Sequence, residues 1–395
     1  MDSYVLPVFN FGSFISVFCR CKRHDVQPGQ EFATCSTVVI LSWASRASRH
    51  WVSAGRRAPL RRRESVSASR IRIGVAMTGL GGRPFSLGGY VSAMHVQKLL
   101  EQEFAADGTA ISWQFFAGEG PAVNEALAQG ALDFAWQGDL PEIVARSRGL
   151  ATRQLLVAGN RMPVLLAANK RAGITGIASL KGKSVANFQG TNLQLSVDRI
   201  LASAGLSERD VHIVNLDQTT AAQAVAQGQI DATFAGLALP QRIAARLDTV
   251  FVTGPRTPAF TAQNSFIVTE QFAAAHPDAV DRVVRVAVQA AHWASQEKNR
   301  TALYEIFDKS GYPADFIRTA FDTLDLKIWN SPLWDGFAAA QLTRSTVDSF
   351  TYGLVRTPVS VSGWIDAGPL RRALAATGLT GFWPSFSPDG LTRLS

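Results

Sequence analysis

A stretch that occurs twice constrains what this chain can fold into. Residues 126–138 read ALAQGALDFAWQG, and residues 224–236 read AVAQGQIDATFAG. Each copy predicts a helix that ends at Ala-Gln-Gly, where glycine adopts the left-handed conformation that closes a helix. A short apolar strand and a glycine turn follow, and then a Pro where another helix opens. The same αβα order is therefore expected once in each of two halves.

The length and the placement of charge agree with two α/β lobes. The chain has 395 residues, 47% of them hydrophobic, which suits two lobes and excludes wholesale disorder. Of the eight formal net positive charges, seven belong to residues 1–70, which hold ten Arg and one Lys against four acids. Because residues 71–395 carry a net charge of only +1, the basic balance does not indicate nucleic-acid binding. No apolar run of about 18 residues predicts a transmembrane helix.

The first seventy residues do not resemble a domain. Residues 58–63, APLRRR, resemble the basic start of an export signal, and residues 65–69, SVSAS, resemble its cleavage end, but the apolar middle is missing. We expect either an export-signal remnant behind a misassigned start or a disordered basic tail. All three cysteines lie in this segment, at Cys19, Cys21 and Cys35. Disulfides, Cys-ligated zinc and Cys nucleophiles are thus excluded from residues 71–395.

The order of predicted elements is the same in the two halves. Residues 71–168 predict a first lobe with βαβαβ order, and residues 169–255 predict a second lobe that repeats it. This order is typical of parallel sheets with right-handed crossovers. Residues 256–395 are expected to return to the first lobe and continue as helices, with the last twenty residues peripheral. The elements expected in the first lobe are a strand at 71–76, a helix at 90–104, a strand at 111–116, a helix at 122–129 and a strand at 132–136.

Five stretches, met in matching order, carry a resemblance to a known family. They are residues 71–75 with the Gly-rich loop behind them, 130–134 with Gly138-Asp139, 180–183 with Gly190-Thr191, 228–232, and 272–277. From about residue 70 to residue 325, the chain resembles the solute-binding proteins of ABC importers for aliphatic sulfonates, nitrate and taurine.

The resemblance implies a fold, a location and partners. It implies an α/β, two-lobed, periplasmic-binding-protein-like clamp of type II, with two crossover strands and a helical C-terminal extension. It also implies a monomer outside the inner membrane, in the periplasm, that delivers its ligand to a permease driven by an ATPase in sulfur metabolism. The expected ligand is a small organic anion, an alkanesulfonate or alternatively taurine or nitrate. No cofactor, metal or nucleic acid is expected.

The helix that begins near Thr191 is a candidate anion site. Thr191 and Gln194 form a T-x-x-Q capping box, which satisfies two helix donors. The remaining first-turn N–H groups and the positive end of the helix dipole favour an anionic head such as a sulfonate. A purely structural cap is the alternative, and the family resemblance favours the anion. Asn192 adds a side-chain donor.

Other candidates lie where strands end, at the edge where open α/β sheets bind ligands. Arg83 is a countercharge or a solvated Arg, and Phe85 a wall of the cleft or a packing residue. Asp139, in a D-x-x-E box, is favoured as a cap, or as a partner for a ligand amine. Asn264 reaches the cleft or forms a turn, and relatives often carry a Trp-Asp-Pro-like corner where this chain has Gly236. The predicted ligand-binding set is Thr78, Arg83, Phe85, Gln137, Gly138, Asp139, Gly190, Thr191, Asn192, Gly236 and Asn264.

A catalytic function has less support in the sequence. The six His residues form no metal-binding spacing, and G-x-S-x-G is absent. Pyrimidine synthases of thiamine formation resemble this chain in fold, but their Cys run is absent here. We therefore expect a binding protein rather than an enzyme; the alternative is a clamp-fold enzyme or binder for a thiamine-pyrimidine precursor.

Overall fold

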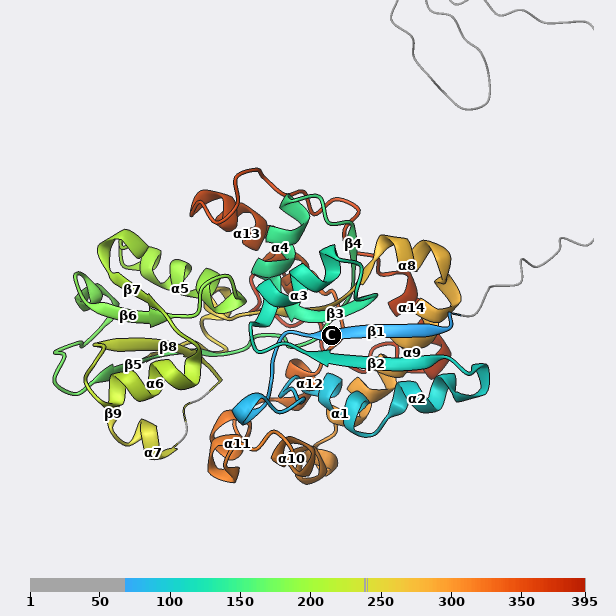
Figure 1. The fold of residues 1–395 in the computed structure, drawn as a ribbon, viewed down its shortest axis with the longest axis horizontal. Coiled ribbons are helices and arrows are strands. Elements are labelled where there is room, and N and C mark those ends of the chain that lie inside the picture. Colours follow the sequence, from blue (N-terminus) through green and yellow to red (C-terminus); the bar gives the residue numbers. More distant parts are fainter. Residues whose placement is uncertain (1–67, 238, 240, 395) are drawn as a thin grey trace, which may run out of the picture. The chain divides into compact units, whose positions relative to one another are not determined.

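The fold follows the order of elements that the repeated stretch predicts (Figure 1). The computed structural model describes residues 68–394 except 238 and 240. The expected export-signal remnant and the three cysteines lie outside the described residues. Within the described part, no helix combines the length and the apolar character needed to cross a bilayer.

The first sheet has the strand order β2-β1-β3-β10-β4. Its first three strands run parallel, as predicted, and β10 runs antiparallel to both of its neighbours. The alternation in the first strand buries Ile71, Ile73 and Val75 completely, because successive side chains of a strand point to opposite faces. The strands are β1 (Arg70–Val75), β2 (Ala110–Phe115), β3 (Phe134–Gly138), β4 (Thr152–Val157) and β10 (Asn264–Thr269).

The second sheet repeats this arrangement with the order β7-β6-β8-β5-β9. Three strands are parallel, and β5 runs antiparallel to β8 and β9. Since β5 pairs in this sheet, the first passage between the sheets lies at residues 158–163, earlier than the expected division after residue 168. The strands are β5 (Val164–Asn169), β6 (Ser184–Asn187), β7 (His212–Asn215), β8 (Ala232–Gly236) and β9 (Leu247–Val252).

The repeated stretch has the same structural role in both sheets. Gly130 and Gly228 close their helices at φ values of 68° and 78°, as the sequence predicts. Asp133 Oδ2 accepts a hydrogen bond from Arg72 N at 2.8 Å, and Asp231 Oδ2 accepts one from Ser184 N, also at 2.8 Å. Each aspartate therefore fixes the start of the neighbouring parallel strand.

Two passages of chain connect the sheets, as the clamp fold requires. The first joins β4 to β5 and the second joins β9 to β10. They are linked by an isolated antiparallel bridge, in which Met162 and Ala262 exchange two N–H···O bonds of 3.0 Å. This bridge lies directly behind the residues that form the candidate site.

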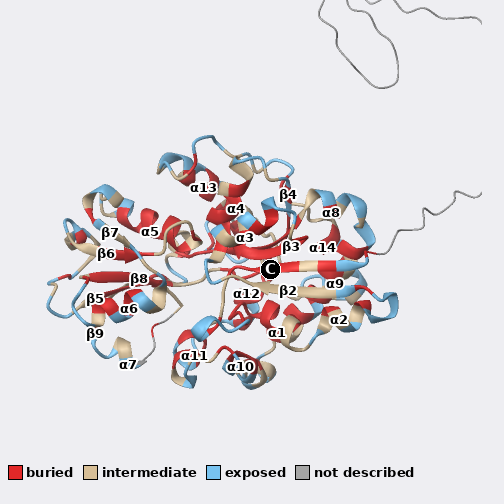
Figure 2. Ribbon diagram, viewed as in Figure 1, coloured by how far each residue is buried: buried red, intermediate tan, exposed pale blue. Residues whose placement is uncertain are grey.

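Helices cover both sheets, and the buried residues concentrate between them and the strands (Figure 2). The single helix expected at residues 90–104 is interrupted at Lys98, which has a φ of 54°. The first part packs on α9 and α10, and the second on β2 and α9. The helices of the two βαβ units are α1 (Tyr90–Val96), α2 (Leu99–Phe104), α3 (Glu119–Ala128), α4 (Asp139–Ser147), α5 (Asn192–Ser203), α6 (Gln218–Ala226) and α7 (Gln241–Ala244).

The C-terminal part is mostly helical, as expected, but its end is not peripheral. Trp383 is 2% exposed within the core of the first lobe, and its indole N–H donates to Ser295 Oγ at 2.8 Å. The prediction that the last twenty residues are peripheral is therefore wrong, because Pro and Gly punctuation does not reveal a buried aromatic anchor. The helices are α8 (Glu270–Ala275), α9 (Pro277–Ala294), α10 (Arg300–Asp308), α11 (Ala314–Phe321), α12 (Leu326–Trp329), α13 (Gly336–Thr351) and α14 (Gly368–Thr377).

Candidate functional site

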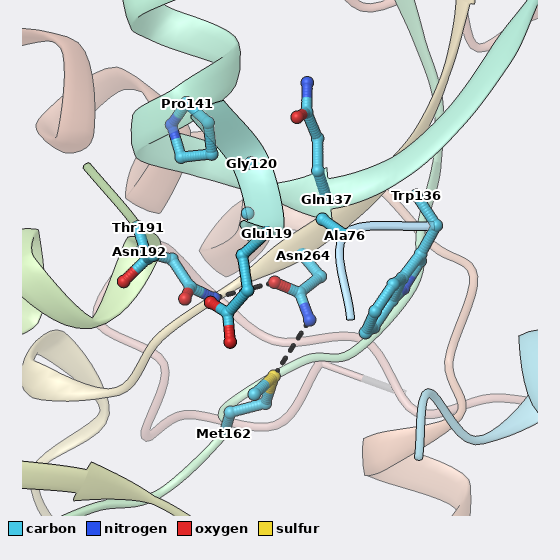
Figure 3. Close-up of a pocket in the computed structure, with 11 residues that line it drawn as sticks. Ala76, Glu119, Gly120, Trp136, Gln137, Pro141, Met162, Thr191, Asn192 and Asn264 are labelled. Atoms are coloured by element: carbon cyan, nitrogen blue, oxygen red, sulfur yellow. Dashed lines mark hydrogen bonds between the residues drawn. The ribbon is translucent and has the colours of Figure 1, made fainter. Parts of the chain in front are cut away.

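A cavity lies where the carboxyl end of β3, the start of α5 and the two passages meet (Figure 3). Its volume is about 30 Å³, close to the share of one water molecule in the liquid. A sulfonate can enter only if the walls move apart. The lining residues are Ala76, Glu119, Gly120, Trp136, Gln137, Gly138, Pro141, Met162, Thr191, Asn192 and Asn264.

Contacts between Gly138, Asn192 and Asn264 close one side of the cavity. Asn192 Nδ2 donates to Asn264 Oδ1 at 2.7 Å, so the first residue of α5 is bonded to the first residue of β10. A Cβ at Gly138 would lie 2.5 Å from the Cβ of Asn192, a distance that real side chains do not reach. Glycine at position 138 thus permits the two lobes to approach this closely, and three predicted site residues meet here.

The start of α5 is held differently from the predicted capping box. Thr191 Oγ1 donates to the carbonyl of Phe188 at 2.8 Å and makes no side-chain cap of the helix. Gln194 Oε1 accepts a hydrogen bond from Gly190 N at 2.7 Å, whereas a capping box would have it accept from Thr191 N. The capping-box prediction is therefore wrong, because the left-handed Gly190 (φ 78°) turns its own N–H towards Gln194. First-turn N–H groups of a helix have no acceptor within the helix, so this end of α5 still presents donors.

Asp139 points away from the cavity. It is the first residue of α4, where Gly138 is the N-cap, and Asp139 Oδ2 accepts from Ser345 Oγ of α13 at 2.6 Å. Burial raises the pKa of Asp139, and the nearby guanidinium of Arg199 opposes that rise. The D-x-x-E box is absent, since Glu142 Oε2 instead accepts from Gln154 at 2.6 Å. Asp139 connects α4 to α13 and lies outside the set of cavity-lining residues.

Three candidates from the first half are not among the residues that line the cavity. Phe85 is 3% exposed in the core of the first lobe. Arg83 is exposed, beside Gly311 at the loop between α10 and α11, and Thr78, half-buried, is not among the residues that line the cavity. Their residue types fitted a cleft, but sequence cannot show which way a loop side chain points.

The remaining candidates lie at or near the cavity. Gln137 lines it, with its amide donating to Asn124 Oδ1 at 3.2 Å. Gly190 lies just beyond the lining, where a Cβ would be 2.9 Å from Pro121 Cγ of the first lobe. Gly236 N donates to Gln218 Oε1 at 2.7 Å, outside the residues that line the cavity.

Sequence reasoning missed Glu119, the acidic residue of the cavity wall (Figure 3). It begins α3 in a left-handed conformation with a φ of 49°, which is uncommon for a residue with a side chain. Burial raises the pKa of Glu119 to about 8, and the carboxylate of Asp217 adds to the rise. The available signal was topological: residues 118–121 follow the second strand of the first half, at the edge of the sheet where ligands bind.

Among the described residues, no group of three or more His, Cys, Asp or Glu is placed to hold a metal ion.

Comparison with known sequences gives one family match and several similar proteins. Residues 104–300 match the family described as NMT1/THI5 like. A protein of Bacillus subtilis strain 168 that carries the name aliphatic sulfonates-binding protein is 28% identical over 208 residues, which are 51% of this chain and 61% of that protein. A protein of the same name from Escherichia coli K12 is 32% identical over 159 residues, 39% of this chain and 47% of that protein. The matches thus span about half the length of these relatives.

Solved structures share the fold over a larger part of the chain. A structure titled as a periplasmic sulfonate-binding protein of Methylobacillus flagellatus KT is 25% identical, has a TM-score of 0.70, and aligns over 81% of this chain and 98% of that chain. The periplasmic nitrate-binding protein of Synechocystis PCC 6803 is 13% identical, with a TM-score of 0.63 over 81% of this chain and 92% of that chain. The desulfurization enzyme DSZB, at 16% identity and a TM-score of 0.59, aligns over 78% of this chain and 100% of that chain. The two-lobed α/β clamp is therefore the fold of this chain.

Proposed function

Since residues 104–300 match the NMT1/THI5-like family, we propose that the chain is the substrate-binding component of an ABC importer and captures an aliphatic sulfonate. The site is the cavity between the two sheets. The observation that supports this most is the meeting of Gly138, Asn192 and Asn264 at the start of α5. The relatives named for aliphatic sulfonates support the choice of ligand.

The anionic head is held by the first turn of α5. The N–H groups of Asn192 and Leu193 have no acceptor within the helix, whereas Gln194 N donates to the carbonyl of Thr191 at 3.1 Å. The helix dipole adds a partial positive charge at this end. The amide of Asn192 supplies a further donor, now bonded to Asn264 at 2.7 Å. A sulfonate oxygen can take the place of Asn264 Oδ1 as the acceptor for the Asn192 amide. Asn264 Nδ2 would keep its bond to Met162 Sδ at 3.1 Å, and Asn264 Oδ1 would need a new donor. Recognition of the anion thus requires no Lys or Arg in the wall.

Capture proceeds by a hinge motion. The two passages, bridged at Met162 and Ala262, can flex while each sheet keeps its own hydrogen bonds. Opening separates the close contacts between Gly138 and Asn192 and between Pro121 and Gly190. Closing around the ligand restores them, so the ligand stabilises the closed arrangement through contacts that it makes with both lobes.

The transport role follows from the same proposal. The closed, loaded protein delivers its ligand to a permease driven by an ATPase, acts as a monomer in the periplasm, and serves sulfur metabolism. It carries out no chemistry on the ligand. Incubating the protein with an alkanesulfonate and recovering the compound unaltered tests this; any sulfite or other product would point to an enzyme.

The site is tested by Asn192→Asp, which adds a carboxylate where the anion is expected. Aspartate in the first turn of a helix is favourable, so the variant should fold, while charge repulsion should weaken ethanesulfonate binding by about tenfold or more. Calorimetric titration measures the affinity. Gln223→Glu adds the same charge to an exposed position of α6 and should leave the affinity unchanged. Equal affinities of Asn192→Asp and wild type would place the anion elsewhere.

A further inference from the structure

The cavity wall contains an acid where the proposed ligand is an anion. Of the eleven lining residues, Glu119 is the carboxylate, and Lys and Arg do not occur among them. Its side chain lies on the first lobe and extends into the space beside Asn192 and Asn264 (Figure 3). A plain alkanesulfonate would lie close to this carboxyl group with no cation of the wall between them. Because burial raises the pKa of Glu119 to about 8, the group would keep its proton near pH 7, and its ionised form would repel the sulfonate.

The backbone around Glu119 shows that this side chain is directed into the cavity at some cost. Glu119 has a φ of 49°, a conformation that glycine adopts without strain. Its neighbour Gly120 packs so closely that a Cβ would lie 2.3 Å from Pro141 Cγ. The close contact fixes the start of α3 against α4, and Glu119 is the residue that this geometry presents to the cavity.

Among the described residues, no cation is found to lower the pKa of Glu119. Asp217, the N-cap of α6, faces it from the second lobe and raises the pKa of Glu119 further. Tyr312 lies close enough to both carboxyl groups for them to raise its own pKa. Arg83, beside Gly311, is exposed and is not among the groups that shift the pKa of Glu119. A positive charge for Glu119 therefore has to come from the ligand.

We propose that Glu119 accepts a hydrogen bond from a protonated amine of the ligand, so that the site selects aminoalkanesulfonates over plain alkanesulfonates. The inference rests on the proposed function, because the sulfonate is still held at the start of α5. A zwitterion places its negative end at the helix donors and its positive end at Glu119. The ammonium favours the ionised form of Glu119, so the carboxyl group gives up its proton when the amine binds, and neither lobe then buries an unpaired charge. The role that the sequence suggested for Asp139 with an amine passes to Glu119.

The test compares taurine with ethanesulfonate, which have the same chain length and differ by the amine. Titration calorimetry at pH 7 on the full chain should show taurine binding about tenfold or more tightly, the range expected for a charge-assisted hydrogen bond. Glu119→Gln should remove most of this preference by weakening taurine while leaving ethanesulfonate unchanged or tighter. Glu125→Gln, on the exposed face of the same helix, should behave as wild type.

The outcomes separate the two proposals. Wild-type protein that binds ethanesulfonate as tightly as taurine, or a Glu119→Gln variant that changes both affinities equally, would overturn the role of Glu119 and leave the sulfonate site standing. Failure of wild type to bind either compound would overturn both proposals. The wild-type comparison needs no variant, so the inference is tested even if Glu119→Gln folds poorly.

Discussion

At the scale of single residues, close approach explains the glycine at position 138. Its φ of −80° and ψ of 162° are open to any residue, so the requirement for glycine does not come from the backbone conformation. It comes from Asn192, whose Cβ would lie 2.5 Å from a side chain at this position. The contact joins the two lobes, so its cost is confined to the closed arrangement.

Gly138→Ala should therefore weaken ligand binding without unfolding the protein. We expect at least a tenfold loss of affinity for the ligand, because the added methyl group prevents full closure, and a thermal midpoint close to that of wild type. Calorimetry and thermal unfolding measure the two quantities. Gly176→Ala, at an extended glycine with open space around it, is the matched control. An unchanged affinity of the Gly138 variant would show that closure does not pass through this contact.

At the scale of elements, α5 connects the site to two polar clusters behind it. Gln194 accepts from Gly190 N and donates to Glu208 Oε1 at 3.0 Å, so the turn at the site is tied to an acidic pair. One turn later, the buried Arg199 donates to Asp348 of α13 at 2.6 Å. The helix that holds the proposed anion is therefore hydrogen-bonded both within its own lobe and to the C-terminal helix α13, and a hinge motion would have to accommodate the second contact.

Two neighbouring acids, Asp198 of α5 and Glu208 beyond its end, should make stability depend on pH. Burial raises the pKa of Asp198 to about 8, Glu208 adds to the rise, and Arg199 opposes it. In the unfolded chain the group ionises near 3.8, so between these values the folded state holds a proton that the unfolded state releases. The contribution of Asp198 to the free energy of unfolding is therefore fully present below about pH 4 and is lost as the pH rises towards 8.

Asp198→Asn should flatten this dependence, because an amide stays neutral. Between pH 6 and pH 8.5, urea unfolding should show wild type losing on the order of 2 kcal/mol more than the variant. Asp248→Asn, at an exposed position of β9, should lose stability as wild type does. Parallel curves for wild type and Asp198→Asn would contradict a proton held at this site.

The parts of the fold that sequence could predict are those set by local chemistry. The glycines and aspartates of the repeated stretch predicted two similar sheets. The structure agrees, because Asp133 and Asp231 accept equivalent backbone hydrogen bonds. The family resemblance suggested that Asn264 reaches the cleft, with a turn as the alternative, and Asn264 lines the cavity. Glu119 could not be found, because its direction depends on a left-handed backbone and on packing between α3 and α4. The same limit applies to Arg83, whose loop turns it to solvent.

At the scale of the whole molecule, two α/β lobes meet at a small cavity and are connected by two bridged passages. The volume of about 30 Å³ means that the site exists for a ligand only through relative motion of the lobes. Each lobe keeps its own sheet and its own buried residues, so such a motion leaves the packing within each lobe intact. The structure thus combines two stable lobes with contacts between them that a ligand can replace.

The most direct test of this account is a crystal structure of the protein grown with taurine. The account predicts a sulfonate with oxygens within hydrogen-bond distance of the first-turn N–H groups of α5 and of the Asn192 amide, and an amine beside Glu119. Taurine bound away from the start of α5, or a cavity that excludes it while the protein binds it elsewhere, would contradict the central claim.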